Sequence, residues 1–167
     1  MMGSGKTTIG QAVAHQLGWE FLDSDRQVEQ RTGRTVAEIW KAEGEQGFRH
    51  LEAEALADAL VSTAGRPAVI AAAGGTVLDP RNRALLESHP PVVWLRARPE
   101  TLAARVGDGA GRPLLGDNPA AALVRLNEER RPYYEQVATA VVDVDDLAAE
   151  HVVERVLAAV RAADPDR

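Results

Sequence analysis

The segment with the clearest potential for chemistry lies near the amino end, in Gly3-Ser4-Gly5-Lys6-Thr7-Thr8. Its last part matches the end of a phosphate-binding loop, G-x-x-x-x-G-K-[ST], in which backbone N–H groups surround nucleotide phosphates. In such a loop Lys6 would neutralise the β- and γ-phosphates, and the Thr7 hydroxyl would bind Mg²⁺. The helix predicted to follow would direct its positive end at the same anion. The segment therefore predicts a nucleotide-binding loop, with a chance glycine-rich stretch as the alternative.

The motif is one residue short at its start. Counting back from Gly5, its first glycine falls one position before Met1, and the strand that leads into such a loop would lie before that glycine. A wrongly assigned start site or a truncated sequence is the simplest explanation. We therefore expect an apolar strand ending in glycine to precede Met1 in the native protein, which would make Met1 or Met2 an internal residue of the loop.

Two carboxylates follow the first predicted strand, in Asp23-Ser24-Asp25. Because open parallel sheets bind ligands outside the carboxyl ends of their strands, these side chains would leave the sheet where a ligand binds. One carboxylate could hold Mg²⁺, directly or through water, and the other could orient a substrate hydroxyl for attack. A helix N-cap and a solvated turn would explain the same residues, so the motif alone leaves both interpretations open.

An arginine and two glycines farther along could contribute to the same site. Arg49 lies three residues before Glu52 on one predicted helix face, an arrangement that an exposed ion pair would also explain. Gly74 and Gly75 end a predicted strand. There they would let a ligand approach the backbone, unless they form only an ordinary turn.

A glycine-rich loop and a pair of arginines carry further positive charge. The loop spans residues 107–116, GDGAGRPLLG, with Arg112 in its middle. Its composition suits a mobile lid, over about residues 107–118, that brings Arg112 to a transferring phosphoryl group, although a plain surface loop would have the same composition. Arg130 and Arg131 lie at the end of a predicted helix. They could bind a carboxylate with two parallel hydrogen bonds, or their positive charge could only interact favourably with the helix dipole.

Short apolar strands and helical segments alternate along the chain. Strands are predicted at 19–23, 68–73, 91–95 and 139–144, and helices at 8–17, 24–31, 35–42, 46–62, 80–88, 99–106, 119–131 and 152–160. This alternation predicts one α/β domain over residues 1–167, with a parallel sheet that helices cover on both faces.

The composition argues against several classes of protein. A chain of 167 residues favours one domain with one core, and with no cysteine it can form neither a disulfide nor a thiolate metal site. The net charge of −6 argues against a nucleic-acid partner, and no apolar run approaches the ~20 residues of a membrane helix. The 4 histidines show no metal-ligand spacing. With no signal pattern at the amino end, we expect a cytoplasmic protein.

Taken together, these stretches resemble the shikimate kinase family over nearly the whole chain. The matching pieces, in order, are GSGKTT, LDSD, TGRTVAEIW, GEQGFRHLE, AGGTVL, GRPLL and RRPYY. The resemblance implies transfer of the γ-phosphoryl group of ATP, with Mg²⁺, to the 3-hydroxyl of shikimate. It also implies a P-loop, nucleoside-monophosphate-kinase-like three-layer α/β/α sandwich, with a parallel sheet in the strand order 2-3-1-4-5. We expect a monomer without nucleic-acid or membrane partners.

The resemblance assigns nucleotide-side roles to individual residues. It makes Lys6 the phosphate-contacting lysine, Arg112 the arginine of the lid and Arg105 a neighbour of the adenine. For Mg²⁺ it implies the Thr7 hydroxyl and Asp23, the acidic residue beside the metal. The other residues expected to bind ATP are Gly3, Ser4, Gly5 and Thr8.

On the substrate side, the resemblance makes Asp25 the carboxylate that holds the shikimate hydroxyls and acts as the base. Arg49 and Arg130 would grip the shikimate carboxylate, Arg130 being preferred over its neighbour because the family pattern is R-x-P-x-Y. Gly74 would offer its backbone to the substrate, with Gly75 beside it. The residues expected to be catalytic are Lys6, Asp25 and Arg112.

Three features depart from the family pattern. Ala73 replaces the first of three strand-end glycines, where its methyl group would either be harmless or crowd the substrate ring. Asp145 and Asp146 stand where the family often places an arginine near the adenine. The strand expected before Met1 would lie at the centre of the sheet, and without it the neighbouring strands would lose ladder partners.

Two other functions stay open at this point. A sister kinase resembling the gluconate kinases would share the phosphate loop, but it would not need Arg49 and Arg130 to converge on a carboxylate beside Asp25. A truncated or inactive paralogue would bind nucleotide without transferring a phosphoryl group.

Overall fold

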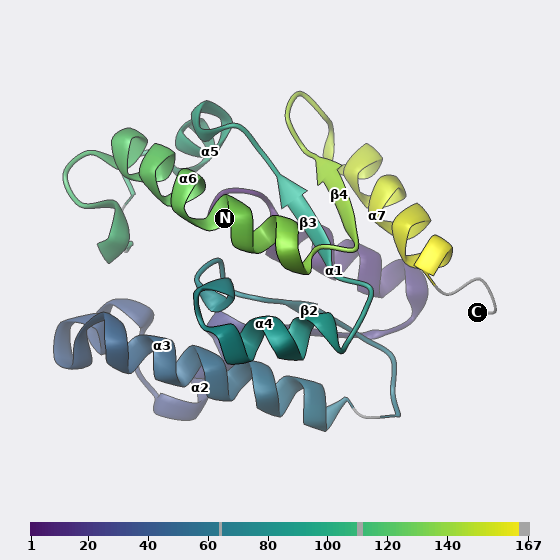
Figure 1. The fold of residues 1–167 in the computed structure, drawn as a ribbon, viewed down its shortest axis with the longest axis horizontal. Helices are drawn as coiled ribbons and strands as arrows, with labels where there is room; N and C mark the ends of the chain where they lie inside the picture. The colour runs from purple at the N-terminus through teal and green to yellow at the C-terminus, as the bar shows by residue number, and fades with distance from the viewer. Residues whose placement is uncertain (64, 110–111, 164–167) are drawn as a thin grey trace.

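The computed structural model describes residues 1–63, 65–109 and 112–163 (Figure 1). Its helices and strands are α1 (Lys6–Leu17), β1 (Glu20–Asp23), α2 (Ser24–Thr32), α3 (Val36–Ser62), β2 (Ala68–Ala71), α4 (Pro80–Glu87), β3 (Val93–Arg96), α5 (Pro99–Val106), α6 (Pro119–Val137), β4 (Ala140–Asp143) and α7 (Ala149–Ala163). Short 3₁₀ turns follow β2 at Thr76–Leu78 and precede α6 at Pro113–Leu115.

The described strands pair in parallel, in two separate sheets. β1 pairs with β2 so that Asp23 lies opposite Ala71, and β3 pairs with β4 so that Arg96 lies opposite Asp143. No ladder among the described residues joins β2 to β3. The parallel α/β class is confirmed. If the strand expected before Met1 is counted as the first, the two pairs are the neighbours 2-3 and 4-5 of the expected order 2-3-1-4-5.

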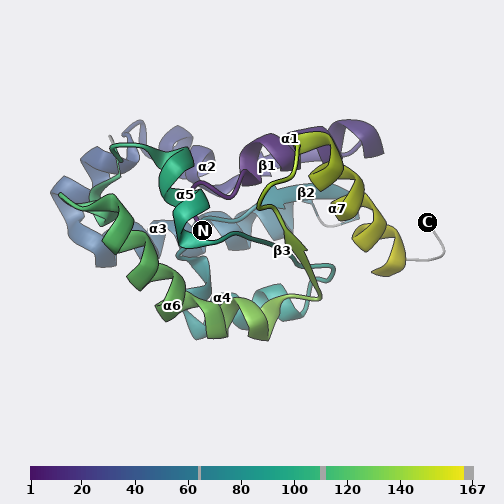
Figure 2. The same ribbon diagram turned by 90° about the horizontal axis from the view of Figure 1, so that it is seen from above.

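Helices cover both sides of the strands. In Figure 2, α1 lies above the strands, α4 and α6 lie below them, and α7 runs down the right-hand side, in contact with α1. α2 and α3 pack against each other at one end of the molecule (Figure 1). The result is the three-layer arrangement that the alternating elements predict.

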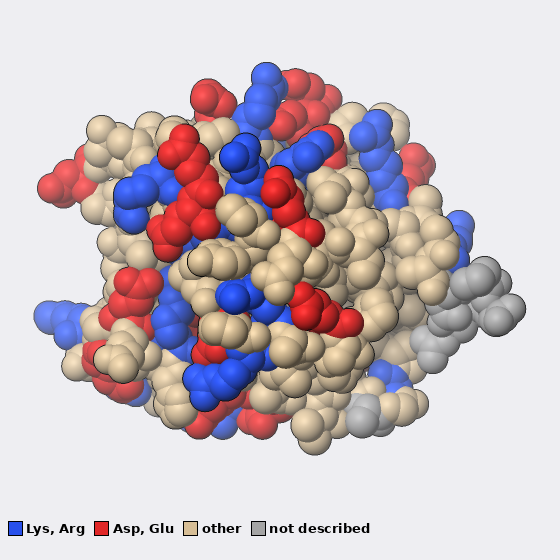
Figure 3. All heavy atoms as spheres, viewed as in Figure 1, with Lys and Arg blue, Asp and Glu red and all other residues tan. Residues whose placement is uncertain are grey.

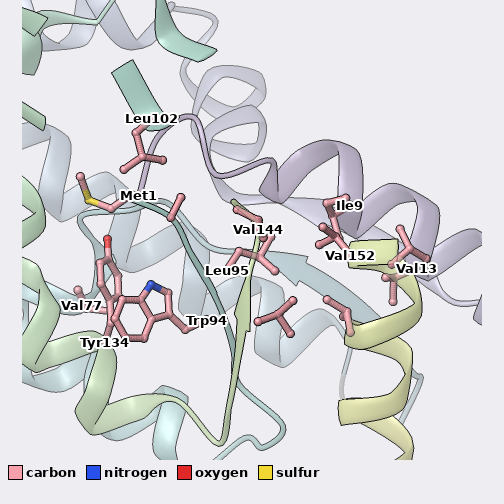
Figure 4. Packing of buried hydrophobic residues seen from close by; sticks show 14 of the residues in the cluster. Met1, Ile9, Val13, Val77, Trp94, Leu95, Leu102, Tyr134, Val144 and Val152 are labelled. Atoms are coloured by element: carbon pink, nitrogen blue, oxygen red, sulfur yellow. The ribbon is translucent and has the colours of Figure 1, made fainter. Parts of the chain in front are cut away.

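The main core joins the two helical layers to the strands. Ile9 and Val13, on the inner face of α1, are buried in one cluster with Trp94 of β3, Tyr134 of α6 and Val152 of α7 (Figure 4). Their spacing of four residues places Ile9 and Val13 on the same side of the helix. This packing fixes α1, and with it the glycine loop from which α1 begins.

α3 agrees with the sequence prediction of two helices at 35–42 and 46–62. Its range contains two helices that meet at a kink, where Gly44 has non-helical backbone angles (φ 67°, ψ −170°). Its start is fixed by a capping box, in which Thr35 and Glu38 satisfy each other's backbone N–H groups. The glycine therefore separates the two helices, as predicted.

α6 is also longer than predicted. The sequence prediction ended it at residue 131, whereas the helix continues through Pro132 to Val137. Tyr134 and Val137 are buried in the main core, and their burial anchors the last turns. Tertiary packing therefore overrides the local helix-breaking tendency of proline.

Charged side chains are mixed over the face seen in Figure 3, where basic and acidic residues lie next to one another. Apolar and uncharged side chains are more frequent toward the side that carries α7, the right of that view. Among the described helices, none is both long and apolar enough to span a bilayer.

Candidate active site

A cavity of about 400 Å³ opens where β1, β2 and the start of α1 meet. Residues from widely separated segments line it, including every predicted site residue except Ser4 and Thr8. Thr8 is exposed, and the Ser4 hydroxyl is turned toward Met1, whose carbonyl oxygen accepts its hydrogen bond at 2.9 Å. The structure thus brings the predicted residues together, with these two side chains outside the cavity.

The glycine loop leads directly into α1. Gly3 and Gly5 both have left-handed backbone angles, with φ of 76° and 90°. A β-carbon on Gly3 would lie 2.9 Å from a methyl carbon of Val106 and 3.1 Å from the carbonyl oxygen of Leu102, so the loop can pack against α5 only with glycine there. The loop therefore places the positive end of α1 at the cavity.

Lys6 is the first residue of α1, and its side chain reaches back over the loop. Its Nζ donates a 2.8 Å hydrogen bond to the carbonyl oxygen of Met1. Burial lowers the pKa of the Lys6 ammonium below its ordinary value, while the carboxylates of Asp25 and Asp23 partly oppose that shift. A partly desolvated cation in this position would be stabilised further by phosphate oxygens.

Asp23 and Thr7 meet at the edge of the cavity. The Thr7 hydroxyl donates to Oδ2 of Asp23 at 2.7 Å. The other carboxylate oxygen, Oδ1, accepts the backbone N–H groups of Asp25 and Arg26 at 3.1 and 3.3 Å, which caps α2. The helix N-cap interpretation of this carboxylate is therefore confirmed, and its other oxygen contacts Thr7 of the phosphate loop.

The Thr7 and Asp23 pair fits the chemistry of a magnesium site. Mg²⁺ takes hard oxygen ligands, keeps several waters and is held by one or two protein groups together with substrate phosphates. A hydroxyl and a carboxylate oxygen 2.7 Å apart, beside the phosphate loop, supply such a set. Within residues 1–63, 65–109 and 112–163, no group of three or more His, Asp or Glu side chains could hold a metal ion without phosphate.

Asp25 lies in the first turn of α2, at the wall of the cavity. Burial raises the pKa of its carboxyl group above the ordinary value, and the positive charge of Lys6 opposes that rise. Asp25 is among the exposed residues, so its carboxylate is accessible to a molecule that enters the cavity. A carboxylate at a cavity wall can accept a proton from a bound hydroxyl.

Two guanidinium groups converge on the loop that follows β2. A β-carbon on Gly74 would lie 3.5 Å from Nη1 of Arg130, and one on Gly75 would overlap the Arg49 guanidinium. Arg130 is only 1 % exposed, and its Nε has no hydrogen-bond partner among the described residues. A buried arginine with an unused donor is poised to bind an anion that enters the cavity.

Arg49 is held in place by several neighbours. It forms an ion pair with Glu52, which is only 2 % exposed, and a 3.1 Å ion pair with Glu45. Its guanidinium also lies 5.9 Å from the ring centre of Trp40 and 5.8 Å from that of Phe48. Burial raises the pKa of Glu52, and the positive charge of Arg49 opposes that rise. The ion pair expected from the spacing is present, but it is not exposed, because Glu52 is buried. It holds Arg49 at the cavity.

Two buried hydroxyl groups that the sequence analysis did not assign to the site brace the strand ends. The Tyr134 hydroxyl donates to the carbonyl oxygen of Gly74 at 2.7 Å. The Ser24 hydroxyl accepts the backbone N–H of Ala73 at 2.8 Å. Tyr134 lies one helical turn after Arg130, so helical spacing could have suggested that both face the same loop.

Arg105 and Arg112 line the far side of the cavity. Nη2 of Arg105 donates to the carbonyl oxygen of Val144 at 2.9 Å. Arg112 precedes the turn at Pro113–Leu115, whose Leu115 is buried in the main core. Residues 110–111 of the predicted lid lie outside the described residues.

The two acidic residues near the end of β4 are engaged with Arg98. The Asp145 carboxylate accepts the backbone N–H of Arg98 at 3.1 Å, and the Asp146 carboxylate pairs with its guanidinium at 2.9 Å. These contacts tie the end of β4 to the segment that follows β3. In this structure both acidic residues therefore brace the fold.

A glycine loop at the start of a helix, a lysine above it and a hydroxyl–carboxylate pair beside it define a P-loop phosphotransferase. Comparison with known proteins narrows that class to one family. The family model "Shikimate kinase" matches residues 2–161. The chain belongs to this family of ATP-dependent phosphotransferases.

Individual relatives match over nearly their whole lengths. The shikimate kinase of Salinispora arenicola is 49% identical over 156 residues, covering 93% of this chain and 91% of the relative. The shikimate kinase of Moorella thermoacetica is 45% identical over 161 residues, which cover 96% of this chain and 91% of the relative.

Solved structures show the same fold. The shikimate kinase of Acinetobacter baumannii in complex with shikimate superimposes with a TM-score of 0.90 at 36% identity, covering 96% of this chain and 89% of that one. The shikimate kinase of Aquifex aeolicus gives a TM-score of 0.81 at 31% identity, and the match covers 97% of this chain and 93% of that one.

Proposed function

We propose that this protein transfers the γ-phosphoryl group of ATP to the 3-hydroxyl of shikimate, giving shikimate 3-phosphate and ADP. The convergence of Arg49 and Arg130 on Gly74 and Gly75, in the same cavity as Asp25, carries the proposal. Two guanidinium groups would hold the shikimate carboxylate at one end of the ring. The ring hydroxyls would then lie between that anchor and the phosphate loop.

On the nucleotide side, the loop from Gly3 to Thr8 would surround the phosphates through its backbone N–H groups. Lys6 would bind the β- and γ-phosphates, and Arg105 would lie beside the adenine. Thr7 and Asp23 would hold Mg²⁺, which when bound neutralises charge on the phosphates. The 2.7 Å contact between the Thr7 hydroxyl and Asp23 supports this assignment.

In the proposed reaction, Asp25 accepts the proton of the shikimate 3-hydroxyl, and the hydroxyl oxygen keeps the electron pair while it forms a bond to the γ-phosphorus. The bond from that phosphorus to the bridging oxygen of ADP breaks, and ADP leaves with the electron pair. Lys6 and Arg112 stabilise the negative charge on the transferring group. Arg49 and Arg130 do not touch the reacting atoms, so their part is to position the substrate.

Segment 107–118 is proposed to act as a lid that closes over the nucleotide and brings Arg112 to the γ-phosphate. The burial of Leu115 and the position of Arg112 at the cavity support a segment that packs down on the site. The monomeric state and the cytoplasmic location expected from the sequence stay predictions.

A substrate panel tests the proposed function. The protein is incubated with Mg-ATP and either shikimate or gluconate, and ADP release and phosphorylated products are followed by ³¹P NMR. We expect shikimate-dependent formation of shikimate 3-phosphate and no turnover of gluconate. Turnover of gluconate alone would indicate the sister kinase. A melting temperature that rises with Mg-ADP, without turnover of either compound, would indicate an inactive nucleotide-binding paralogue.

A further inference from the structure

The backbone that follows β2 has its carbonyl oxygens engaged and two of its N–H groups free. The Gly74 carbonyl accepts the Tyr134 hydroxyl at 2.7 Å. The carbonyl groups on either side of it accept N–H groups of the following turn, at 3.1 and 2.9 Å. Among the described residues, no acceptor takes the N–H of Gly74 or of Gly75. The segment therefore has unused donors, while its acceptors are occupied.

Tyr134 approaches Gly74 from the main core. Its side chain is 7 % exposed and stacks on Trp94, with ring centres 5.4 Å apart (Figure 4). Tyr134 lies outside the lining of the candidate active site, which includes Gly74, Gly75 and Arg49. The Gly74 carbonyl is therefore turned toward the core and away from the cavity.

The direction of this carbonyl also sets the direction of the next N–H group. The peptide bond between Gly74 and Gly75 is trans, so the C=O of the first residue and the N–H of the second point in opposite directions. With the carbonyl held on Tyr134, the Gly75 N–H points away from the core. The Arg49 guanidinium lies directly against Gly75 on the cavity side.

Backbone preference alone does not fix this peptide. Turning it over would exchange the positions of its C=O and N–H groups, mainly by rotation about ψ of Gly74 and φ of Gly75. Gly75 has a φ of −90°, and the turned peptide would give it a positive φ, which glycine adopts about as readily. The hydrogen bond from Tyr134 is therefore what favours the observed orientation.

The same hydroxyl is linked to Arg130. Tyr134 lies one helical turn after Arg130 on α6, and burial raises the pKa of its hydroxyl group. The positive charge of Arg130 and a hydrogen bond with its side chain oppose that rise. One buried hydroxyl thus connects an arginine of the cavity to the peptide after β2.

We propose that Tyr134 is a positioning residue that makes the site select a carboxylate over an uncharged amide. This rests on the proposed function, in which Arg49 and Arg130 bind the shikimate carboxylate. Tyr134 holds the Gly74–Gly75 peptide with its N–H toward the carboxylate. Without the hydroxyl, the peptide can turn its carbonyl oxygen toward the ligand, where it would repel a carboxylate and accept a hydrogen bond from a carboxamide.

The test uses two ring compounds that carry only the group in question, cyclohex-1-ene-1-carboxylate and cyclohex-1-ene-1-carboxamide. Their binding is followed by NMR at the backbone amides of Gly74 and Gly75. Tyr134→Phe removes the hydroxyl and keeps the ring that stacks on Trp94. The matched control is Tyr133→Phe, since the Tyr133 ring lies 4.5 Å from the Arg83 guanidinium and not at Gly74.

We expect the carboxylate to shift the Gly75 amide proton downfield in the unaltered protein. Tyr134→Phe should raise the Kd of the carboxylate at least about tenfold and that of the carboxamide less than about threefold. Tyr133→Phe should change both values by less than about twofold. A purely structural role of the hydroxyl would weaken the binding of both compounds alike.

The proposal is overturned if Tyr134→Phe weakens both compounds equally, if Tyr133→Phe has the same effect, or if the carboxylate leaves the Gly75 amide of the unaltered protein unshifted. The last measurement decides even if Tyr134→Phe fails to fold. Shikimate turnover is assayed separately on the unaltered protein. An active enzyme without the selective loss would reject the role of Tyr134 alone, whereas the selective loss in a protein that does not phosphorylate shikimate would reject the proposed function alone.

Discussion

The guanidinium of Arg49 occupies the space that any side chain on Gly75 would need. A β-carbon at position 75 would overlap Nη1 and Cζ of the arginine, whereas the nearest atoms to a β-carbon on Gly74 lie 3.4 Å away. Arg49 is itself fixed by Glu52, Glu45 and two aromatic rings. Because residue 75 is a glycine, there is room for the Arg49 guanidinium near the end of β2. The ion pair with Glu52 on α3 holds it there.

The first prediction follows from this contact. Gly75→Ala should raise the KM for shikimate by at least about tenfold, because the methyl group pushes the Arg49 guanidinium away from the substrate carboxylate. The KM for ATP should change by less than about threefold. Steady-state kinetics checks both values, with Gly74→Ala as the matched variant that should have the smaller effect. Equal effects of the two variants on the KM for shikimate would contradict the steric explanation.

Arg49→Ala and Arg130→Ala should each weaken shikimate binding and leave ATP binding nearly intact. Losing one charge-assisted, two-pronged contact costs about 1.5–3 kcal/mol, or about 10- to 150-fold in KM. The neighbouring Arg131 is exposed, so Arg131→Ala is the matched control and should change the KM for shikimate by less than about twofold. If only the KM for ATP changed, the two arginines would have to be assigned to ATP binding and not to shikimate binding.

Arg112→Ala should lower kcat by at least about 100-fold, with little change in the KM for shikimate. Arg112 lines the nucleotide side of the cavity, where its charge would act on the transferring phosphoryl group. Arg112→Lys should restore little of the lost rate, because an ammonium group lacks the planar fork that spans two phosphate oxygens. A kcat for Arg112→Ala within about threefold of the unaltered protein would mean that segment 107–118 is only a surface connection.

Asp25 should make both activity and stability depend on pH. Because burial raises its pKa, the rate should fall on acidification at a higher pH than for an ordinary aspartate. The same shift means that ionised Asp25 destabilises the fold at pH values above the folded-state pKa. Asp25→Asn should therefore melt at a higher temperature than the unaltered protein at pH 7, with a smaller gain near pH 4, while losing most of its kcat. If the gain in melting temperature grew on acidification, the pKa of Asp25 would be lowered in the folded protein, which would contradict this prediction.

The sequence was sufficient to predict which residues line the cavity where local spacing places them. Lys6 and Thr7 lie at fixed offsets in the phosphate loop, and Asp23 and Asp25 directly follow a strand. The alternation of elements was likewise enough for the parallel α/β class. These predictions depend on contacts between residues that are close in the chain.

The braces of the site could not be predicted, because they join distant residues. Tyr134 reaches the carbonyl of Gly74 across 60 positions, and Ser24 reaches the N–H of Ala73 across 49. The length of α6 was missed for the same reason. Its continuation beyond Pro132 depends on burial against elements far away in the sequence, which local propensity does not contain.

The most direct test of the central claim is the rate of ADP formation from Mg-ATP with and without shikimate. It is measured on the protein and, as the control, on its Lys6→Ala variant. We predict shikimate-dependent ADP formation, with shikimate 3-phosphate as the product and no rate above background for Lys6→Ala. If the protein folds and binds Mg-ADP, yet shikimate does not accelerate ADP formation, the proposed function is wrong.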